Sequence, residues 1–565
     1  MLARTVDSLG DRLRQYVTVP TDASSVSASL AVDIRTFPWI RRLASDYAFA
    51  YEKVAPFFAG DPGTTAAWAD TIRRSQGYAR QPAAIARVIA AQQEQRGAPP
   101  AARASAARLA DPVTRVVITG QQAGLFGGPL FTLLKALTTM KLAAKVEREH
   151  QVPVVPVFWI DAEDHDWLEV NGCTVLDAEL APTTIRLREP AGAGQLPIAS
   201  LALTDSTTTI DQLAAALPES EFKADILASL HQAYAPGTGM ATAFGTWIER
   251  VLGPHGLVVY DSSDPAAKPL AREVFVTEVS QPGATAGIAA RAGEALVARG
   301  YHAQATLADG TVSLFHLNTG RAPVRVGGHH AYLGDRELSV GELADEARLH
   351  PERFSPNVLL RPIVQDTVFP TICYVAGPNE LAYLGQLHEV YAHFGVPMPL
   401  MYQRATATLA DSATVRFLAK YDLPLTALRA RDEAALNHLL ESQLPPTVEQ
   451  SLTAVATVID ERMAAVAAAV PQIDPTLEGA VKSTLGKLQH EVHSLHNKVI
   501  QAAKRRDETL RRQFQRAQAL TFPQGHPQER EVGFVWFLNR YGPALVDRLI
   551  DELPLEMGHH WVLTI

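Results

Sequence analysis

The sequence is poor in cysteine and in long apolar runs. Its 565 residues include only two cysteines, Cys173 and Cys373, far apart along the chain, so a disulfide framework or a Cys-x-x-Cys metal cluster is excluded. The longest strongly apolar run, residues 152–160, is much shorter than the roughly 20 residues that cross a bilayer. The first residues, MLARTVDSLGDRLRQYV, lack the apolar core of a signal peptide. These absences predict a soluble, cytoplasmic protein that does not bind membranes.

An excess of positive charge is missing as well. The chain has 51 Lys and Arg against 60 Asp and Glu, a formal net charge of −9, and such a field repels phosphate backbones. We therefore do not expect nucleic acid as a partner. Hydrophobic residues make up 47% and charged residues 20%, which is usual for globular proteins, and the length predicts about three or four structural units.

The apolar pattern predicts an α/β core with a parallel sheet. The β-branched run at 116–120 is followed by a glycine-rich loop and then by a periodic segment at 129–145, typical of strand, loop and helix. Residues 152–160 are apolar at nearly every position, as expected of a parallel strand covered on both faces. Further strands are predicted at 256–260 and 370–375.

Two other segments differ from this core. Residues 301–332 alternate apolar and polar side chains around Asp-Gly and Thr-Gly turns, which predicts an antiparallel insertion. Between 411 and 522 glycine is rare, and apolar residues recur at spacings typical of a helix that faces a partner helix. The upstream helix at 449–470 is the expected partner in an antiparallel coiled-coil arm. The residues of this seam are Val481, Leu485, Leu488, Val492, Leu495 and Val499.

These patterns predict the domain boundaries. The expected parts are an N-terminal helical collar at 1–110, a first core part at 111–300, a β-rich insertion at 301–345, a second core part at 346–410, a coiled-coil arm at 411–522, and a C-terminal segment at 523–565. The last segment is rich in aromatic and apolar residues, so we expect it to dock onto the body of the protein.

The glycine-rich loop is the first candidate site. In open parallel sheets, ligands collect beyond the carboxyl ends of the strands. The loop matches neither GxGxxG nor GxxxxGK[ST], and its glycines are equally well explained by turns that need positive φ. Gln121 and Gln122 nevertheless place two amides there, and Lys135 follows in the helix. We expect Gly120, Gln121, Gln122, Gly124 and Lys135 to bind substrate.

An acidic segment, DAEDHD at 161–166, follows the predicted strand at 152–160 directly. So many ionisable groups repel one another unless a cationic ligand, a metal ion or neighbouring Arg and Lys residues offset them. His165 is the predicted general base, with Glu163, Asp164 and Asp166 orienting it or binding a substrate amine, and Asp161 binding substrate. A zinc or magnesium ion is the less expected explanation, because adjacent residues seldom all face one ion.

A third polar group surrounds the predicted strand at 370–375. Arg361 precedes it, and a guanidinium can make a bidentate contact with a carboxylate or a phosphate. Asn379 begins a predicted helix at 379–394, where it is also explained as a helix cap. The members of this group, which we expect to bind substrate, are Arg361, Gln365, Asp366, Asn379, Glu380 and Tyr383.

Four longer strings together resemble the bacillithiol biosynthesis BshC family of cysteine ligases. They are TGQQAGLFGGPLFTLLK, VPVFWIDAEDHDWLEVN, LLRPIVQDTVFPTICYVAGPNELAYLGQL and PQEREVGFVWFLNRYG, and they follow one another from about residue 115 to the C-terminus. The resemblance implies a Rossmann-like core related to class I aminoacyl-tRNA synthetases and nucleotidylyltransferases. It also implies connecting-peptide insertions and a coiled-coil arm that mediates a homodimer.

The reaction that the resemblance implies is the last step of bacillithiol synthesis, which joins cysteine to the amine of glucosaminyl-malate. Acidic groups at 161–166 suit the amine, and Arg361 or Lys135 suits a carboxylate. The HIGH and KMSKS strings of the synthetases are absent, so how cysteine is activated stays open. The resemblance implies that an adenine nucleotide, ATP or ADP, binds in a second pocket near the arm, with Lys498, Asn539 and Tyr541 as candidate residues.

Two other classes of function stay open. The carboxylate cluster also suits a metal-dependent nucleotidylyltransferase or phosphate-ester hydrolase. The coiled-coil arm and the missing ATP motifs also suit a non-catalytic scaffold that binds a nucleotide.

Overall fold

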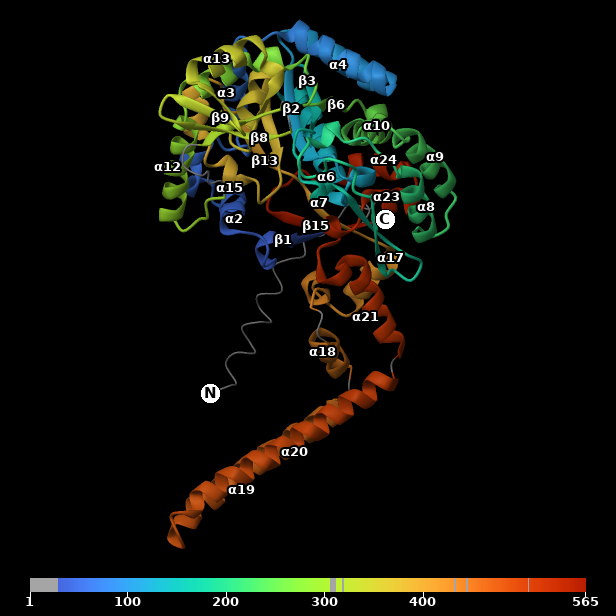
Figure 1. Ribbon diagram of the computed structural model, residues 1–565. Coiled ribbons are helices and arrows are strands. Elements are labelled where there is room, and N and C mark those ends of the chain that lie inside the picture. The colour runs from blue at the N-terminus through green and yellow to red at the C-terminus, as the bar shows by residue number, and fades with distance from the viewer. Residues whose placement is uncertain (1–28, 305–310, 318–319, 431–432, 444–445, 507) are drawn as a thin grey trace. The chain divides into compact units, whose positions relative to one another are not determined.

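The computed structural model describes residues 29–304, 311–317, 320–430, 433–443, 446–506 and 508–565 (Figure 1). The chain divides into two compact units, one formed by the described residues up to Leu409 together with Gln528–Ile565, the other by Ala410–Pro527. Residues 1–28 of the expected N-terminal collar lie outside the described residues. None of the described helices is both long enough and apolar enough to pass through a membrane.

A five-stranded parallel sheet forms the core of the first unit, in the order β13-β12-β2-β3-β6 (Figure 1). The strands are β2 (Arg115–Gln122), β3 (Val154–Asp161), β6 (Val258–Asp261), β12 (Thr371–Ala376) and β13 (Leu400–Gln403). Helix α6 (Leu130–His150) crosses from β2 to β3 and packs against both strands. Val116 and Ile118 enter one apolar cluster and Val117 another, because both faces of the sheet are covered. The predicted α/β fold with a Rossmann-like parallel sheet is confirmed.

The glycine-rich loop that leads from β2 into α6 is held by the C-terminal part of the chain. Gly127 and Gly128 have φ angles of 96° and 77°, a region that glycine enters without steric strain. A Cβ atom on Gly127 would lie 2.2 Å from the ring of Phe534. The backbone N–H of Phe534 donates to the carbonyl of Gly128 at 3.1 Å. The turn into α6 is therefore fixed by packing against a segment about 400 residues later in the sequence.

Helices and a short hairpin surround the sheet. Before β2 lie α2 (Arg42–Phe49), α3 (Thr65–Gln76), α4 (Pro82–Arg96) and α5 (Pro100–Ala107). Between β3 and β6 lie α7 (Trp167–Val170), β4 (Gly172–Leu176), β5 (Pro182–Arg186), α8 (Ser206–Ala216), α9 (Lys223–Ala233) and α10 (Met240–Leu252). After β6 come α11 (Arg272–Ser280) and α12 (Ala284–Ala298).

The predicted antiparallel insertion is a second five-stranded sheet, in the order β10-β9-β8-β7-β11. Its elements are β7 (Thr311–His316), β8 (Ala322–Gly327), β9 (His330–Leu333), β10 (Arg336–Ser339), α13 (Val340–Leu349) and β11 (Phe354–Pro356). The chain returns to the core through α14 (Arg361–Val368). The single helix expected at 379–394 is instead two short helices, α15 (Leu381–Leu384) and α16 (His388–Phe394), because the chain bends at 385–387.

The C-terminal residues join the N-terminal ones in a third sheet of three strands, in the order β1-β15-β14. These strands are β1 (Ser29–Asp33), β14 (Thr406–Ala410) and β15 (His559–Thr564), and α22 (Gln528–Glu531), α23 (Phe534–Tyr541) and α24 (Ala544–Glu552) precede β15. The described part of the predicted helical collar therefore begins with a strand.

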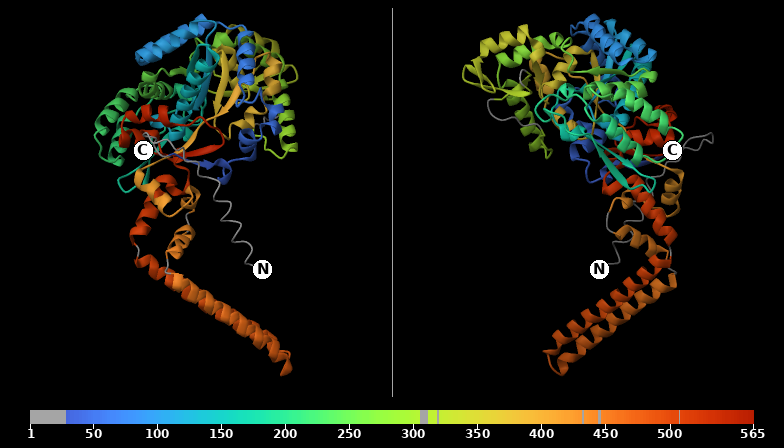
Figure 2. Two further views of the ribbon diagram at one scale, coloured as in Figure 1. Left: turned by 180° about the vertical axis from the view of Figure 1, so that it is seen from behind. Right: turned by 45° about the vertical axis from the view of Figure 1, so that its right-hand side comes forward.

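The second unit contains an antiparallel helix pair, α19 (Pro446–Ala469) and α20 (Leu477–Arg506), which lie side by side in every view (Figures 1 and 2). The amide of Gln489 on α20 donates to Asp460 on α19 at 2.9 Å. The other helices of this unit are α17 (Ser412–Lys420), α18 (Ala434–Ser442) and α21 (Glu508–Thr521). The predicted coiled coil is confirmed.

Candidate active site

The carboxyl ends of β2 and β3 meet at one edge of the parallel sheet. Gln121 and Gln122 are in register with Ile160 and Asp161, so the end of β2 and the acidic segment are neighbours in space. A pocket of about 590 Å³ opens at this edge. The predicted site residues that line it are Gly120, Gln121, Gln122, Lys135, Asp161, Asp164, Arg361, Glu380 and Tyr383.

Asp164 is the most heavily hydrogen-bonded acid of the pocket. Its carboxylate accepts from Gln122 Nε2 at 2.6 Å, from Arg321 Nη1 at 3.0 Å and from the backbone N–H of His165 at 2.8 Å. Burial raises the pKa of Asp164, but the bonds from Gln122, Arg321 and the His165 N–H outweigh it and leave that pKa below its ordinary value. Asp164 is therefore an anion at neutral pH, already paired by the protein.

Asp161 differs from Asp164 in having no partner. It is the last residue of β3, half-buried, and lines the same pocket. Among the described residues, no group donates a hydrogen bond to its carboxylate and no cation lies within ion-pair distance. Burial raises the pKa of Asp161 despite the nearby charge of Arg361.

Two other acids of the segment have structural contacts. Glu163 is 5% exposed and forms an ion pair of 2.5 Å with Lys268, which is also 5% exposed. The Lys268 ammonium donates in addition to the carbonyl of Phe354 at 3.1 Å, and so joins the segment to β11. Asp166 is the N-cap of α7 and accepts from the N–H of Glu169 at 3.2 Å. Neither acid is among the residues that line the pocket.

His165 also lies outside the lining of the pocket. Its Nδ1 is 3.0 Å from Nη1 of Arg321. A guanidinium has donors only, so Nδ1 accepts this bond and the ring proton of neutral His165 is on Nε2. The predicted role of His165 as a general base stays a prediction.

The floor of the pocket is a buried lysine. Lys135 is 1% exposed, and its ammonium donates to the carbonyl of Gly120 at 2.8 Å and to the side chain of Gln121 at 3.3 Å. It also forms an ion pair with Glu380, whose second oxygen accepts from Tyr374 at 3.1 Å. Burial lowers the pKa of Lys135, and Glu380 opposes that effect. Lys135 therefore holds the end of β2 and the start of α15 together.

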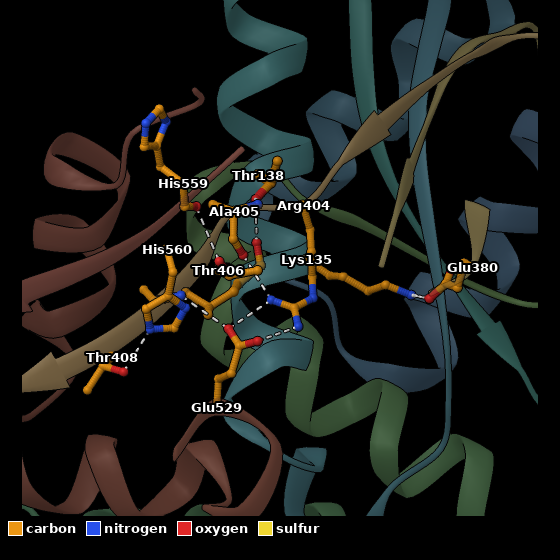
Figure 3. A network of polar contacts seen from close by, with 12 residues as sticks. Lys135, Thr138, Glu380, Arg404, Ala405, Thr406, Thr408, Glu529, His559 and His560 are labelled. Atoms are coloured by element: carbon orange, nitrogen blue, oxygen red, sulfur yellow. Dashed lines mark hydrogen bonds and ion pairs between the residues drawn. The ribbon is translucent and has the colours of Figure 1, made fainter. Parts of the chain in front are cut away.

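Figure 3 shows the ion pair of Lys135 with Glu380 beside a group of polar contacts made by Arg404 and Glu529. Arg404, in the loop after β13, makes two bonds to Glu529 of α22, at 2.9 and 2.7 Å. Glu529 also accepts from the backbone N–H of Ala407 at 3.1 Å, and His560 of β15 pairs with Thr408 at 2.8 Å. The network fixes the C-terminal segment against the sheet behind Lys135.

Arg361 is a buried cation in the wall of the pocket. It is 8% exposed, begins α14 and donates to Gln365 at 3.0 Å. Its guanidinium lies 5.5 Å from the ring centre of Tyr374. Burial lowers the pKa of a guanidinium, yet Tyr374, Tyr383 and Asp161 hold the pKa of Arg361 above its ordinary value. No described carboxylate lies within ion-pair distance of it.

Other predicted site residues are not brought to the pocket. Gly124 begins the turn after β2, and Gln365 is fully buried behind Arg361. Asp366 is fully buried and accepts from Tyr391 at 2.5 Å and from Gln365 at 2.9 Å. Asn379 also lies outside the lining. The expected substrate contacts of these four residues stay predictions.

Sequence reasoning missed several residues of the pocket. Arg321, from the connection between β7 and β8, enters from the antiparallel insertion and stacks on Phe315, 4.0 Å from the ring centre. Glu169 of α7 and Tyr374 of β12 also line the pocket. Arg321 stands between Gly320 and Ala322 in a predicted turn, so no local pattern pointed to it. Tyr374 could have been found, because alternate residues of a strand near its carboxyl end face the same side.

The predicted nucleotide residues fall in both units. Asn539, on α23 of the first unit, is 1% exposed; its oxygen accepts from Ser220 at 3.2 Å and its nitrogen donates to the carbonyl of Pro218 at 3.0 Å. Tyr541, at the end of α23, lies beside Arg540, whose guanidinium is 5.5 Å from its ring centre. Lys498 is exposed on α20 of the second unit. Since the Asn539 amide is already paired, the geometry adds no support for its contact with a nucleotide, and the three assignments stay predictions.

A second pocket of about 610 Å³ lies between α12 and α16. None of the predicted site residues lines it, and its two arginines, Arg291 and Arg299, are exposed at the surface. The pocket at the ends of β2 and β3 combines a buried cation with an unpaired acid, so it is the better candidate for chemistry.

Comparison with known proteins gives the same family for both parts of the chain. Residues 30–405 match the family described as "Bacillithiol biosynthesis BshC, N-terminal Rossmann-like domain", and residues 407–565 match "Bacillithiol biosynthesis BshC, C-terminal coiled-coil domain". A protein of Salinibacter ruber is 33% identical over 535 residues, which cover 92% of this chain and 95% of that protein. A protein of Symbiobacterium thermophilum is 34% identical over 500 residues, covering 85% and 89%. Both relatives bear the name "Putative cysteine ligase BshC".

Proposed function

The chain belongs to the bacillithiol biosynthesis BshC family, and from this premise we propose that it is a cysteine ligase that joins cysteine to the amine of glucosaminyl-malate. The product of this carbon–nitrogen bond formation is bacillithiol. The reacting groups are an amine and a carboxyl group, and the acceptor carries the carboxylates of its malyl part. A site for this reaction needs a cation for carboxylates and an anion for the protonated amine.

The observation that carries the proposal is Arg361. A guanidinium that is 8% exposed and has no carboxylate partner among the described residues is a favourable place for an anionic ligand. Arg361 lines the pocket together with Asp161 and Asp164. One pocket therefore offers a cation for a carboxylate and acids for an ammonium group, which fits the two substrates.

The experiment is complementation of a strain that lacks its own ligase, with bacillithiol measured by thiol labelling. Arg361→Met should lower bacillithiol at least tenfold, because one lost charge-assisted bond to a carboxylate weakens binding by about 2 kcal/mol. Arg348→Met is the matched control, since Arg348 is an exposed arginine paired with Asp345 at 2.6 Å. Full bacillithiol with Arg361→Met, or none with the wild-type chain, would contradict the proposal.

Activation of cysteine is a separate part of the proposal. Amide formation from a free carboxylate is uphill in water, so an adenine nucleotide is the expected source of activation. Purified protein should make bacillithiol from cysteine and glucosaminyl-malate only when ATP, or an extract that supplies an activated cysteine, is added. Product formation without either would remove the nucleotide from the proposal.

We also propose that the coiled-coil arm pairs with a second copy of the chain. Six apolar side chains of α19 and α20 are 37–53% exposed in the single copy, so the helix pair leaves part of its apolar surface uncovered. They are Val455, Val458, Val466, Leu477, Leu488 and Leu495. A cytoplasmic location is part of the same proposal, and the two cysteines, both free and buried, agree with reducing surroundings.

A further inference from the structure

We infer that Asp161 is the catalytic residue that takes the proton from the substrate amine, an inference that rests on the proposed ligase function. An amine attacks a carboxyl carbon only as the neutral group, so an ammonium substrate must first lose a proton. The protein group that accepts this proton has to line the pocket, have a free lone pair and be held by a rigid element.

The other acids of the site are already paired or lie at the surface. Asp164 accepts three hydrogen bonds, Glu380 is paired with Lys135 and Tyr374, and Glu163 is paired with Lys268. Glu169 lines the pocket but is exposed on the short helix α7, where water competes with a substrate. Asp161 alone, among the acids that line the described part of the pocket, is half-buried and has no hydrogen-bond or ion-pair partner.

The position of Asp161 is set by the backbone. It closes β3 between β2 and β6, with Gln122 opposite it on β2 and the preceding residue, Ile160, opposite Asp261 on β6. A residue paired with a neighbouring strand moves less than one on a loop, so its carboxylate is presented in one place. Burial makes Asp161 a stronger base than an ordinary aspartate, because it raises the pKa.

His165 is less suited to this role in the observed geometry. The lone pair of Nδ1 is engaged by Arg321 at 3.0 Å, and Nε2 carries the ring proton. His165 also does not line the pocket. The ring could accept a proton only after its contact with Arg321 breaks.

The proposed step is a single proton transfer. The N–H bond of the ammonium group breaks, its electron pair stays on nitrogen, and the proton forms an O–H bond with Asp161. A charged pair, ammonium and carboxylate, becomes a neutral amine and a carboxylic acid. The low polarity that raises the pKa of Asp161 favours this neutral pair, and no oxidant or further reactant is needed.

The first test measures binding without turnover. Glucosaminyl-malate and its N-acetyl analogue, which has no ammonium group, are titrated by calorimetry at pH 7 into the wild-type chain and Asp161→Asn. The substitution should weaken the binding of glucosaminyl-malate by about tenfold, the size of one charge-assisted contact, and leave the binding of the N-acetyl analogue unchanged. Asp211→Asn, at an exposed position on α8, is the control and should change neither. Equal effects on both ligands, or no effect on either, would overturn the inference.

The second test measures the proton transfer in the complete reaction. The charged groups that face Asp161 are Arg361 of α14, Asp164, Glu169 of α7, Arg321 of the insertion and Lys268. None is altered by Asp161→Asn, so the change in the pH profile reports on Asp161. The rate of Asp161→Asn relative to wild type should rise with pH up to the pKa of the substrate amine. As the pH rises, more of the substrate amine has already lost its proton to solvent and no longer needs Asp161. Formate should restore at least a tenfold gain in rate to Asp161→Ala and none to His165→Ala.

The outcomes separate the two proposals. If the wild-type chain neither binds glucosaminyl-malate nor forms product, the ligase function fails. The inference fails, and Asp161 is structural, if the wild-type chain is active but Asp161→Asn loses the same fraction of activity at every pH and formate does not rescue Asp161→Ala. Thermal melting within 2 °C of wild type for Asp161→Asn, the usual size for a surface change, identifies the variant as folded.

Discussion

Nη1 of Arg321 lies 3.0 Å from both Oδ1 of Asp164 and Nδ1 of His165. One guanidinium from the antiparallel insertion thus fixes an acid and a histidine that are adjacent in sequence. Because the guanidinium only donates, it stabilises the Asp164 carboxylate and can donate to Nδ1 of His165. The acidic segment is therefore ordered by a residue 157 positions away from Asp164.

Arg321→Gln should raise the pKa of Asp164. The substitution removes an attractive charge and one hydrogen bond, while the bonds from Gln122 and the His165 N–H stay. A carbon-13 titration of aspartate carboxyl groups measures the shift. Arg325→Gln, an exposed change on the neighbouring strand β8, should leave the titration curve unchanged. The same curve for both variants would mean that Arg321 does not set the charge of Asp164.

Glu163→Gln should destabilise the fold rather than alter the pH dependence of the rate. It leaves Lys268, 5% exposed, without an anionic partner, and breaking a buried ion pair from one side typically removes about 3 kcal/mol of unfolding free energy. Urea unfolding measures the loss. The double variant Glu163→Leu, Lys268→Met should lose less unfolding free energy than the sum of the losses in the single variants Glu163→Leu and Lys268→Met. Additive losses would contradict the ion pair.

Gly127→Ala tests the contact between the glycine-rich loop and the C-terminal segment. The new Cβ atom would overlap the ring of Phe534 and would also sit at a φ of 96°. Gly97→Ala is the matched control, because Gly97 has a φ of 69° but nothing within 4 Å of the added atom. We expect a loss of about 1 kcal/mol for Gly97→Ala and at least 2 kcal/mol for Gly127→Ala. Similar losses in urea unfolding would show that the overlap is relieved without strain.

His560 should make the fold less stable as the pH falls. Burial lowers its pKa to about 4, outweighing the nearby Glu529, so between pH 6.5 and about 4 the unfolded chain binds a proton that the folded chain does not. Stability therefore drops with falling pH across this window, by roughly 3 kcal/mol for a shift of this size. Unfolding free energies at pH 7 and pH 4.5 should differ less for His560→Gln than for wild type. His329→Gln, at an exposed position, should keep the wild-type difference in unfolding free energy between the two pH values. An equal difference in wild type and both variants would exclude His560 as the source of the pH dependence.

The coiled-coil arm should give a dimer in solution. Sedimentation is expected to give twice the chain mass of 61.2 kDa. Replacing Leu488 and Leu495 together by Gln removes two of the exposed apolar side chains and should weaken association by at least tenfold. Replacing the exposed Lys482 and Lys487 by Gln should leave association unchanged. A wild-type monomer of 61.2 kDa at micromolar concentration would contradict the proposal.

Much of the fold could be read from the amino-acid pattern. Residues 152–160 are apolar because both faces of β3 are buried, and the heptad spacing of Leu485 and Val492 follows from the contact of α20 with α19. The boundaries were less accurate where a turn interrupts a helix, as between α15 and α16, because local propensity does not reveal how the chain packs.

The candidate site could be located from the sequence, but the state of its residues could not. Both strands of a βαβ unit carried polar residues at their carboxyl ends, so a shared pocket was predictable. The sequence could not show which acid has no partner, because the partners are distant in sequence. Lys268 is 105 positions from Glu163, and Glu380 is 245 positions from Lys135.

The sequence by itself determined the α/β class, the coiled coil and the edge of the sheet where polar side chains line a pocket, because these depend on periodicity and on strand direction. Only the tertiary structure decided that Glu163 is a structural ion-pair partner, that Asp164 is held by Arg321 and that Asp161 is left unpaired. The physical reason is that charge and hydrogen bonding act over a few ångströms in space, whatever the separation along the chain.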